Sequence, residues 1–220
     1  MKRKTLQRLV RIIIHIIAKV EFYGTENVPA SGGVILATNH MSRIDIPLLF
    51  ANPVRPEITA LVTNKYQDYA FIRWFTNTAE GVWLDRTKAD FTAFRQAAEI
   101  IQAGKSLGIA PEGTRSDNAS LIEAKVGTAL LAVRTGAPVV PVAITGTEMA
   151  VARFKHLQRA HLVAHFGKPL PPPALSRDNR EAELQRYTDE IMCQIAALLP
   201  SSYRGFYAEH PRLKEILGQT

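Results

Sequence analysis

The stretch VILATNHMSRIDIP, residues 34–47, joins an apolar run to a polar turn and then to a second apolar segment. The run from Val34 to Thr38 is short, continuous and rich in branched side chains, which is typical of a strand buried on both faces. Ile46-Pro47 favours a helix that begins nearby, because proline is tolerated in the first turn of a helix. A strand that leads through a polar turn into a helix predicts an α/β fold, with chemistry at the strand's carboxyl end.

The same alternation of short strands and helices continues along the chain on both sides of this stretch. It predicts a single α/β domain with a mixed, mostly parallel β-sheet covered by helices. The predicted strands are Val20 to Tyr23, Val34 to Thr38, Ile58 to Thr63, Val82 to Leu84, Leu107 to Ala110, Val139 to Thr145 and His161 to Phe166. The predicted helices are Ile46 to Phe50, Gln67 to Phe75, Ala89 to Ala103, Gly127 to Arg134, Glu148 to Phe154 and Arg180 to Leu199, with a last one after Pro211.

Residues 1–19 are predicted to form a basic amphipathic helix in front of the main domain, residues 20–220. Basic side chains recur every three or four positions, and the rest of the helix is apolar. One interpretation is a helix packed on the core with a solvated basic stripe. The other is a helix that lies in a membrane interface, where basic side chains favour anionic headgroups. The predicted stripe comprises Lys4, Arg8, Arg11, His15 and Lys19.

This N-terminal helix is not expected to span a membrane. A spanning helix needs about 20 mostly apolar residues, whereas the segment from Leu9 to Ala18 is shorter and is interrupted by Arg11 and His15. The expected placement is therefore peripheral (monotopic), on the cytoplasmic face of a membrane.

The net charge of +7 points to an anionic partner, such as a membrane surface, a phosphorylated substrate or nucleic acid. Nucleic-acid binding would favour base-stacking aromatic residues among the basic ones. The N-terminal basic stripe contains none before Phe22, so an anionic membrane surface is the favoured partner. No His/Cys metal spacing or glycine-rich nucleotide loop is present, and no metal or cofactor is expected.

Polar clusters directly follow three of the predicted strands, and ligands of open α/β sheets bind at such strand ends. In the first cluster His40 and Asp45 are five residues apart, so they can meet only across a turn, with Asp45 at the start of the next helix. A carboxylate bonded to one imidazole nitrogen fixes the tautomer, and the other nitrogen can accept a proton from a hydroxyl. The pair is a candidate general base and its orienting acid.

The other two clusters predict anion binding. Arg86 and Arg115 carry planar guanidinium groups suited to bidentate phosphate contacts, and Gly113 allows backbone amides to approach an anion closely. Glu112 would repel a phosphate if it faced the ligand, so it is expected to orient Arg115 or to brace its own loop.

Together these clusters resemble four ordered motifs of the lysophosphatidic acid acyltransferase family, the PlsC-type 1-acyl-sn-glycerol-3-phosphate O-acyltransferases. The resemblance covers residues 20–144 and implies a glycerol-3-phosphate acyltransferase-like fold. An alanine, Ala110, stands where an aromatic residue often precedes the third motif. The motifs are Asn39-His40 with Asp45; Gly81-Val82-Trp83-Leu84-Asp85-Arg86; Pro111-Glu112-Gly113-Thr114-Arg115-Ser116; and the apolar run around Pro141.

The resemblance implies that an acyl group passes directly from an acyl-CoA or acyl carrier protein thioester to a lysophospholipid hydroxyl. His40 would be the general base and Asp45 its orienting residue, while Arg86, Arg115 and Lys65 would hold the phosphate of the acceptor. The favoured acceptor is 1-acyl-sn-glycerol 3-phosphate, and the product phosphatidic acid. Two alternatives stay open: another lysolipid acceptor, with a larger head group or of the ornithine type, and a non-catalytic basic membrane-binding protein.

Overall fold

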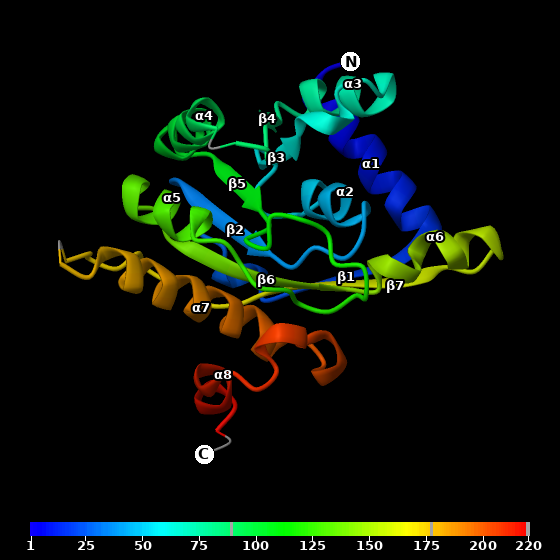
Figure 1. Ribbon diagram of the computed structural model, residues 1–220. Helices are drawn as coiled ribbons and strands as arrows, with labels where there is room; N and C mark the ends of the chain where they lie inside the picture. Colours follow the sequence, from blue (N-terminus) through cyan, green and yellow to red (C-terminus); the bar gives the residue numbers. More distant parts are fainter. Residues whose placement is uncertain (89, 177, 219–220) are drawn as a thin grey trace.

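The computed structural model describes residues 1–88, 90–176 and 178–218. Within these ranges seven strands form one sheet in the order β1-β7-β6-β2-β5-β3-β4 (Figure 1). The strands are β1 Ala18–Tyr23, β2 Val34–Thr38, β3 Thr59–Thr63, β4 Val82–Leu84, β5 Ser106–Ile109, β6 Val139–Thr145 and β7 Ala160–Phe166. The helices are α1 Arg3–Ile17, α2 Asp45–Phe50, α3 Ala70–Thr78, α4 Phe91–Gln102, α5 Gly127–Thr135, α6 Thr147–Lys155, α7 Arg180–Leu198 and α8 Pro211–Ile216, with 3₁₀ turns η1 Thr25–Asn27, η2 Asn64–Tyr66, η3 Ser201–Tyr203 and η4 Gly205–Tyr207.

Strand direction divides the sheet into two parts. From β6 through β2, β5 and β3 to β4, each neighbouring pair is parallel. β1 and β7 are parallel to each other, and β7 is antiparallel to β6. The carboxyl ends of β6, β2, β5, β3 and β4 therefore lie along one edge of the sheet, where α/β proteins place their ligands.

The core lies on both faces of this sheet, as the apolar run in β2 predicts. Val34 and Leu36 are buried in a cluster with α1, α2 and β7. Ile35 and Ala37 are buried in the opposite cluster, with α4, α5, α7 and α8. Successive side chains of a strand point to opposite faces, so every position of a doubly covered strand is buried. Figure 1 shows α1 and α2 on one side of the sheet and α7 on the other.

The predicted α/β class, the mostly parallel sheet and the N-terminal helix are confirmed. Several boundaries were wrong. The third helix region begins at Ala70 and ends at Thr78 instead of running from residue 67 to 75. The fourth helix is described from Phe91, and its predicted start at Ala89 lies outside the described residues. The first helix ends at Ile17, two residues before its predicted end, because β1 begins at Ala18 and pairs with β7.

One face of helix α1 packs against the core, and another face is exposed to solvent. Leu6, Val10 and Ile14 are buried against α2 and the sheet. The predicted basic stripe was wrong at its last position, because the helix ends before Lys19. Arg11 donates hydrogen bonds to carbonyl groups at the end of α2, and Lys19 lies on β1, where it pairs with Glu21. Four apolar side chains of α1 are nevertheless exposed: Leu9, Ile12, Ile13 and Ile16.

Within the described ranges, no helix combines the length and the apolar character that crossing a bilayer requires.

Candidate active site

His40 and Asp45 meet at the carboxyl end of β2, which confirms the predicted contact. The His40 Nδ1 atom lies 2.9 Å from Asp45 Oδ2. The His40 side chain is 16% exposed and the Asp45 side chain only 2% exposed. A carboxylate can only accept, so Nδ1 carries the hydrogen and Nε2 keeps its lone pair for a proton from outside.

Asp45 is fixed by more than the imidazole. Its Oδ2 atom accepts hydrogen bonds from the backbone N–H groups of Met41 and Ser42, each at 2.8 Å. Its other oxygen, Oδ1, accepts a hydrogen bond from the hydroxyl of Thr147, the first residue of α6. These donors hold the carboxylate in one orientation and stabilise its charge.

Asn39 fixes the point at which the chain leaves β2. Its side-chain nitrogen donates to the backbone oxygen of Ile144 at 2.8 Å, and its Oδ1 atom accepts from the Ile144 N–H at 2.7 Å. The side chain thereby imitates a backbone pairing with β6, so the following residue, His40, starts from a rigid position. Pro141 lies in the buried interior of β6 opposite Ala37, and its carbonyl accepts a hydrogen bond from Gly167.

Glu112 braces the other side of His40. Its Oε1 atom accepts a hydrogen bond from the His40 backbone N–H at 2.8 Å, and its Oε2 atom accepts from Ile122 at 3.0 Å. Burial raises the pKa of Glu112 to about 7. Of the two predicted roles, the structure supports bracing, because both carboxylate oxygens contact backbone N–H groups and the residue is buried.

The chain turns sharply after Glu112 and returns to His40. Gly113 adopts a φ of +69°, and a Cβ atom there would lie 3.4 Å from the Lys125 side chain. Thr114 is exposed and Arg115 is half-buried. The next N–H, of Ser116, donates to the His40 carbonyl at 2.9 Å, so the backbone of Arg115 is held beside the candidate base.

Arg86 stands on an exposed turn at the end of β4. The preceding Asp85 accepts hydrogen bonds from both the N–H and the hydroxyl of Thr87, which lower the pKa of Asp85. Asp90 caps α4 and accepts from the Asp85 N–H, which closes the turn. Partial desolvation lowers the pKa of Arg86, while the nearby Tyr66 opposes this.

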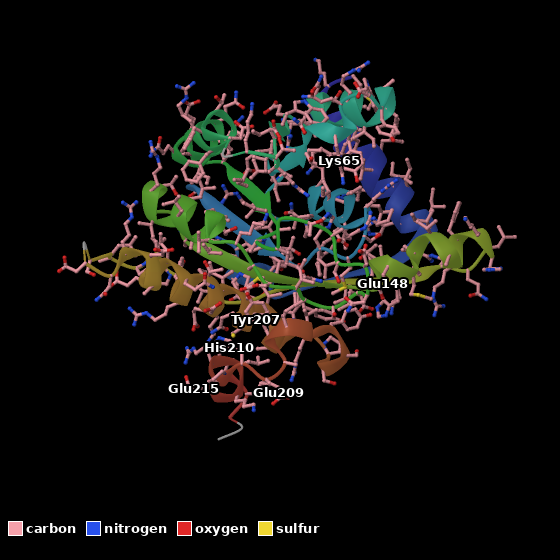
Figure 2. The ribbon with its side chains drawn as sticks, viewed as in Figure 1. Lys65, Glu148, Tyr207, Glu209, His210 and Glu215 are labelled. Carbon is pink, nitrogen blue, oxygen red and sulfur yellow. The ribbon has the colours of Figure 1, made fainter. Side chains whose placement is uncertain are left out.

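Lys65 is in η2, the 3₁₀ turn that follows β3 (Figure 2). Its Nζ atom lies 5.0 Å from the centre of the Tyr66 ring, and the Arg43 guanidinium lies 5.7 Å from the same ring. Two cations, Lys65 and Arg43, therefore lie over the ring of Tyr66.

The described residues contain no cluster of three or more histidine, cysteine or acidic side chains arranged to hold a metal ion. Chemically, the strand ends combine an imidazole, oriented by a buried carboxylate, with the cationic side chains of Arg115, Lys65 and Arg86. Such an arrangement can remove a proton from a hydroxyl group of an anionic molecule.

Comparison with known proteins agrees with this geometry. Residues 19–145 match the family model described as Acyltransferase. The chain belongs to this acyltransferase family.

Individual relatives extend the similarity of the acyltransferase beyond the matched region. It is 24% identical over 189 residues to the 1-acyl-sn-glycerol-3-phosphate acyltransferase of Bacillus subtilis, a match over 86% of this chain and 92% of the relative. It is 27% identical over 131 residues to the enzyme of that name from Borreliella burgdorferi, covering 59% of this chain but only about half, 52%, of the relative. The crystal structure of the PlsC acyltransferase from Thermotoga maritima superposes with a TM-score of 0.67 at 26% identity, over 86% of this chain and 76% of that one.

Two site residues of the acyltransferase were missed by sequence reasoning. Thr147 lies 102 positions from Asp45, and no local spacing connects them. Its position just after β6 could nevertheless have indicated a site residue, because ligands of α/β sheets bind at the carboxyl ends of strands, which is the argument that selected His40. Arg43 was quoted within the first cluster but given no role, since nothing in the sequence shows that η2 brings Tyr66 to it.

Proposed function

We propose that the protein transfers a fatty acyl group from an acyl-CoA or acyl carrier protein thioester to the hydroxyl of a lysophospholipid. The favoured acceptor is 1-acyl-sn-glycerol 3-phosphate, which gives phosphatidic acid. The observation that carries the proposal is the His40–Asp45 contact at 2.9 Å, with Nδ1 engaged and Nε2 left to accept a proton. The names of the relatives support this acceptor, but identities of 24–27% do not distinguish it from other lysolipids.

The reaction requires a single proton carrier. His40 Nε2 takes the proton of the acceptor hydroxyl while the oxygen attacks the thioester carbonyl carbon. The tetrahedral intermediate then collapses, the carbon–sulfur bond breaks, and the imidazolium returns the proton to the thiolate. Asp45 stabilises the imidazolium, which exists only between these two steps. No acyl group is attached to the protein at any stage.

Phosphate binding is assigned in this proposal to the cations at the ends of β5, β3 and β4. Neighbouring strands are about 4.8 Å apart, so the end of β4 lies roughly 14 Å from the end of β2, and β5 and β3 lie between them. In the order of the strands away from β2, Arg115 follows β5, Lys65 follows β3 and Arg86 follows β4. We expect the phosphate of an acceptor whose hydroxyl reaches His40 to lie towards β5 and β3, where long arginine side chains from the flanking turns could contact it.

A panel of purified protein, acyl donors and lysophospholipids, with products identified by mass spectrometry, tests the proposal. The expected result is phosphatidic acid from 1-acyl-sn-glycerol 3-phosphate, thiol release that depends on the acceptor, and no acylated protein. His40→Ala should reduce the rate by about 10²–10⁴-fold while the fold is retained. A larger-headed or ornithine-type product would reassign the acceptor. A His40→Ala protein with a normal rate would refute the mechanism and favour a non-catalytic membrane-binding role.

We also propose that the protein binds an anionic membrane surface peripherally, on the cytoplasmic face. Figure 1 shows α3, α1 and α6 following one another along one side of the molecule. Hydrogen bonds from Arg159, which lies between α6 and β7, to the carbonyls of His15 and Ala18 connect this segment to the end of α1 and the start of β1. Interfacial binding favours exposed apolar and aromatic side chains with basic neighbours. Those exposed here are Leu9, Ile12, Ile13 and Ile16 on α1, Tyr69, Phe71 and Trp74 at α3, and Met149, Val151, Phe154 and Leu157 at α6.

Sedimentation with anionic vesicles tests this placement. Replacing Ile12 and Ile16 with glutamine should release the protein from vesicles, while activity on a short-chain, water-soluble acceptor survives. Phe91→Gln is the control, because Phe91 is even more exposed than Ile12 and Ile16 but lies on α4. Arg8→Glu should weaken binding at low salt only, since a basic residue at an anionic surface contributes about 1 kcal/mol that salt screens. Equal binding by all variants would contradict the placement.

A further inference from the structure

Tyr203, in η3 near the C-terminus, connects two segments that hold His40 and Asp45. We propose that Tyr203 is a positioning residue for the acyl transfer, acting through Glu148 on one side and through the loop between β5 and α5 on the other. The inference rests on the proposed function, because it takes His40 as the general base. Tyr203 and Glu148 both lie outside residues 19–145, the part of the chain that the family model matches.

The first connection runs through the start of α6. The Tyr203 hydroxyl donates a hydrogen bond to Glu148 Oε1 at 2.7 Å. Glu148 directly follows Thr147, and the Thr147 hydroxyl donates to Asp45 Oδ1. Figure 2 shows Glu148 at the end of α6 that is nearest the C-terminal segment. By holding Glu148, Tyr203 holds the turn of helix that presents Thr147 to Asp45.

The second connection runs through backbone hydrogen bonds. The Leu121 N–H donates to the Tyr203 carbonyl at 2.9 Å. The next N–H, of Ile122, donates to Glu112 Oε2 at 3.0 Å, and Glu112 Oε1 accepts from the His40 N–H at 2.8 Å. Tyr203 is therefore tied to the backbone of the candidate base as well as to its carboxylate partner.

The C-terminal segment is built to approach this loop closely. The Phe206 N–H donates to the Leu121 carbonyl at 2.9 Å, so Leu121 is bonded on both sides. Gly205 has a φ of +44°, and a Cβ atom there would lie 2.1 Å from the Leu121 oxygen. Tyr207, fully buried, accepts a hydrogen bond from the Ala124 N–H through its hydroxyl oxygen. These contacts with the C-terminal segment restrict the movement of the loop between β5 and α5.

The hydrogen bonding of the Glu148 side chain depends on the Tyr203 hydroxyl. Among the described residues, Tyr203 supplies the one hydrogen bond that the structure gives to the Glu148 carboxylate, and the Oε2 atom is buried without a partner. Burial raises the pKa of Tyr203 to about 12, so its hydroxyl keeps the proton that it donates. Removing this donor would leave the partly buried Glu148 carboxylate without any hydrogen bond from the described residues, which favours movement of the start of α6.

Tyr203→Phe tests the inference, since it removes the hydroxyl and keeps the ring. With an acyl-CoA donor and 1-acyl-sn-glycerol 3-phosphate, kcat should fall about tenfold, equivalent to about 1.4 kcal/mol in activation free energy, while KM for both substrates is unchanged. Tyr187→Phe is the matched control. Its hydroxyl also donates a single hydrogen bond, to the Leu170 carbonyl, away from the loop, and the variant should retain wild-type kinetics.

A purely structural role is distinguished by combining Tyr203→Phe with His40→Ala. A residue that acts by positioning His40 has nothing left to position, so the residual rate, measured with a radiolabelled acyl donor, should not fall further. Equal losses in both backgrounds would overturn the inference, as would an unchanged kcat. If Tyr203→Phe fails to fold, Glu148→Ala takes its place and should show the same loss of kcat. A normal rate for His40→Ala would instead refute the proposed function itself.

Discussion

Replacement of Asp45 by asparagine separates the charge of this residue from its hydrogen bonds. The Oδ2 atom accepts from Met41, Ser42 and His40, so the amide oxygen of an asparagine is expected to take this position. The reversed orientation would point an NH₂ group at two backbone N–H donors. The NH₂ group instead faces the Thr147 hydroxyl, which can rotate to accept a hydrogen bond. The imidazole tautomer is therefore kept and only the negative charge is lost.

The magnitude follows from that difference. A hydrogen bond to a charged partner contributes about 1.5–3 kcal/mol and a neutral one about 0.5–1.5 kcal/mol. The imidazolium formed during catalysis would thus lose about 1–2 kcal/mol, which lowers kcat about 5- to 30-fold. This loss is smaller than the 10²–10⁴-fold expected for His40→Ala.

Acceptor-dependent thiol release from acyl-CoA measures both variants, and thermal unfolding checks that each is folded. Asp45→Ala is the companion variant, because it leaves two buried backbone N–H groups without an acceptor and should unfold at a lower temperature. An Asp45→Asn protein that is well folded and as inactive as His40→Ala would refute the reasoning, since it would mean that the backbone donors do not set the orientation of the amide.

Two further predictions concern the loop after β5 and the cations. Because burial raises the pKa of Glu112 to about 7, the folded state binds this proton more tightly than the unfolded chain, and stability should fall by about 3 kcal/mol as pH rises from about 4.5 through 7. Urea unfolding across this range should show a flatter pH dependence for Glu112→Gln; an equal slope would contradict the assignment. Arg115→Ala and Arg86→Ala should raise KM for a phosphate-bearing acceptor, and lysine at either position should restore it only partly. Wild-type saturation curves for both would place the phosphate elsewhere.

Local patterns in the sequence were sufficient to predict the bounds of strands that are buried apolar runs. The bounds of β2 and β4 were predicted without error, because each is a short apolar run between polar turns. The His40–Asp45 contact was also predictable, since Pro47 indicates where the helix begins. The end of α1 could not be predicted, because Ile16, Ile17 and Ala18 form an unbroken apolar segment that continues from the helix into the strand. Pairing of Ala18 with Ala160 in β7 decides where the strand starts, and no local pattern reports it.

Long-range contacts also explain why the supports of the site were missed. Thr147 and Tyr203 reach Asp45 and Glu148 across 102 and 55 positions. Only the strand order, with β6 beside β2, places α6 next to the turn that carries Asp45. The hydrogen bonds of Arg11 are a similar case, since helical spacing does not report the two carbonyl oxygens that the end of α2 offers it.

The strand order separates the buried part of the site, around His40, from the exposed part, at the ends of β3 and β4. His40 stands on β2, and its neighbours on both sides, β5 and β6, supply the buried supports Glu112 and Thr147. The turns after β3 and β4, which carry Lys65 and Arg86, are exposed and lie beyond β5. If these turns hold the head group, as we propose, substitutions on them should change which head group binds without disturbing buried hydrogen bonds. Acceptor choice should therefore depend on residues at β3 and β4, whereas the proton transfer depends on those at β5, β2 and β6.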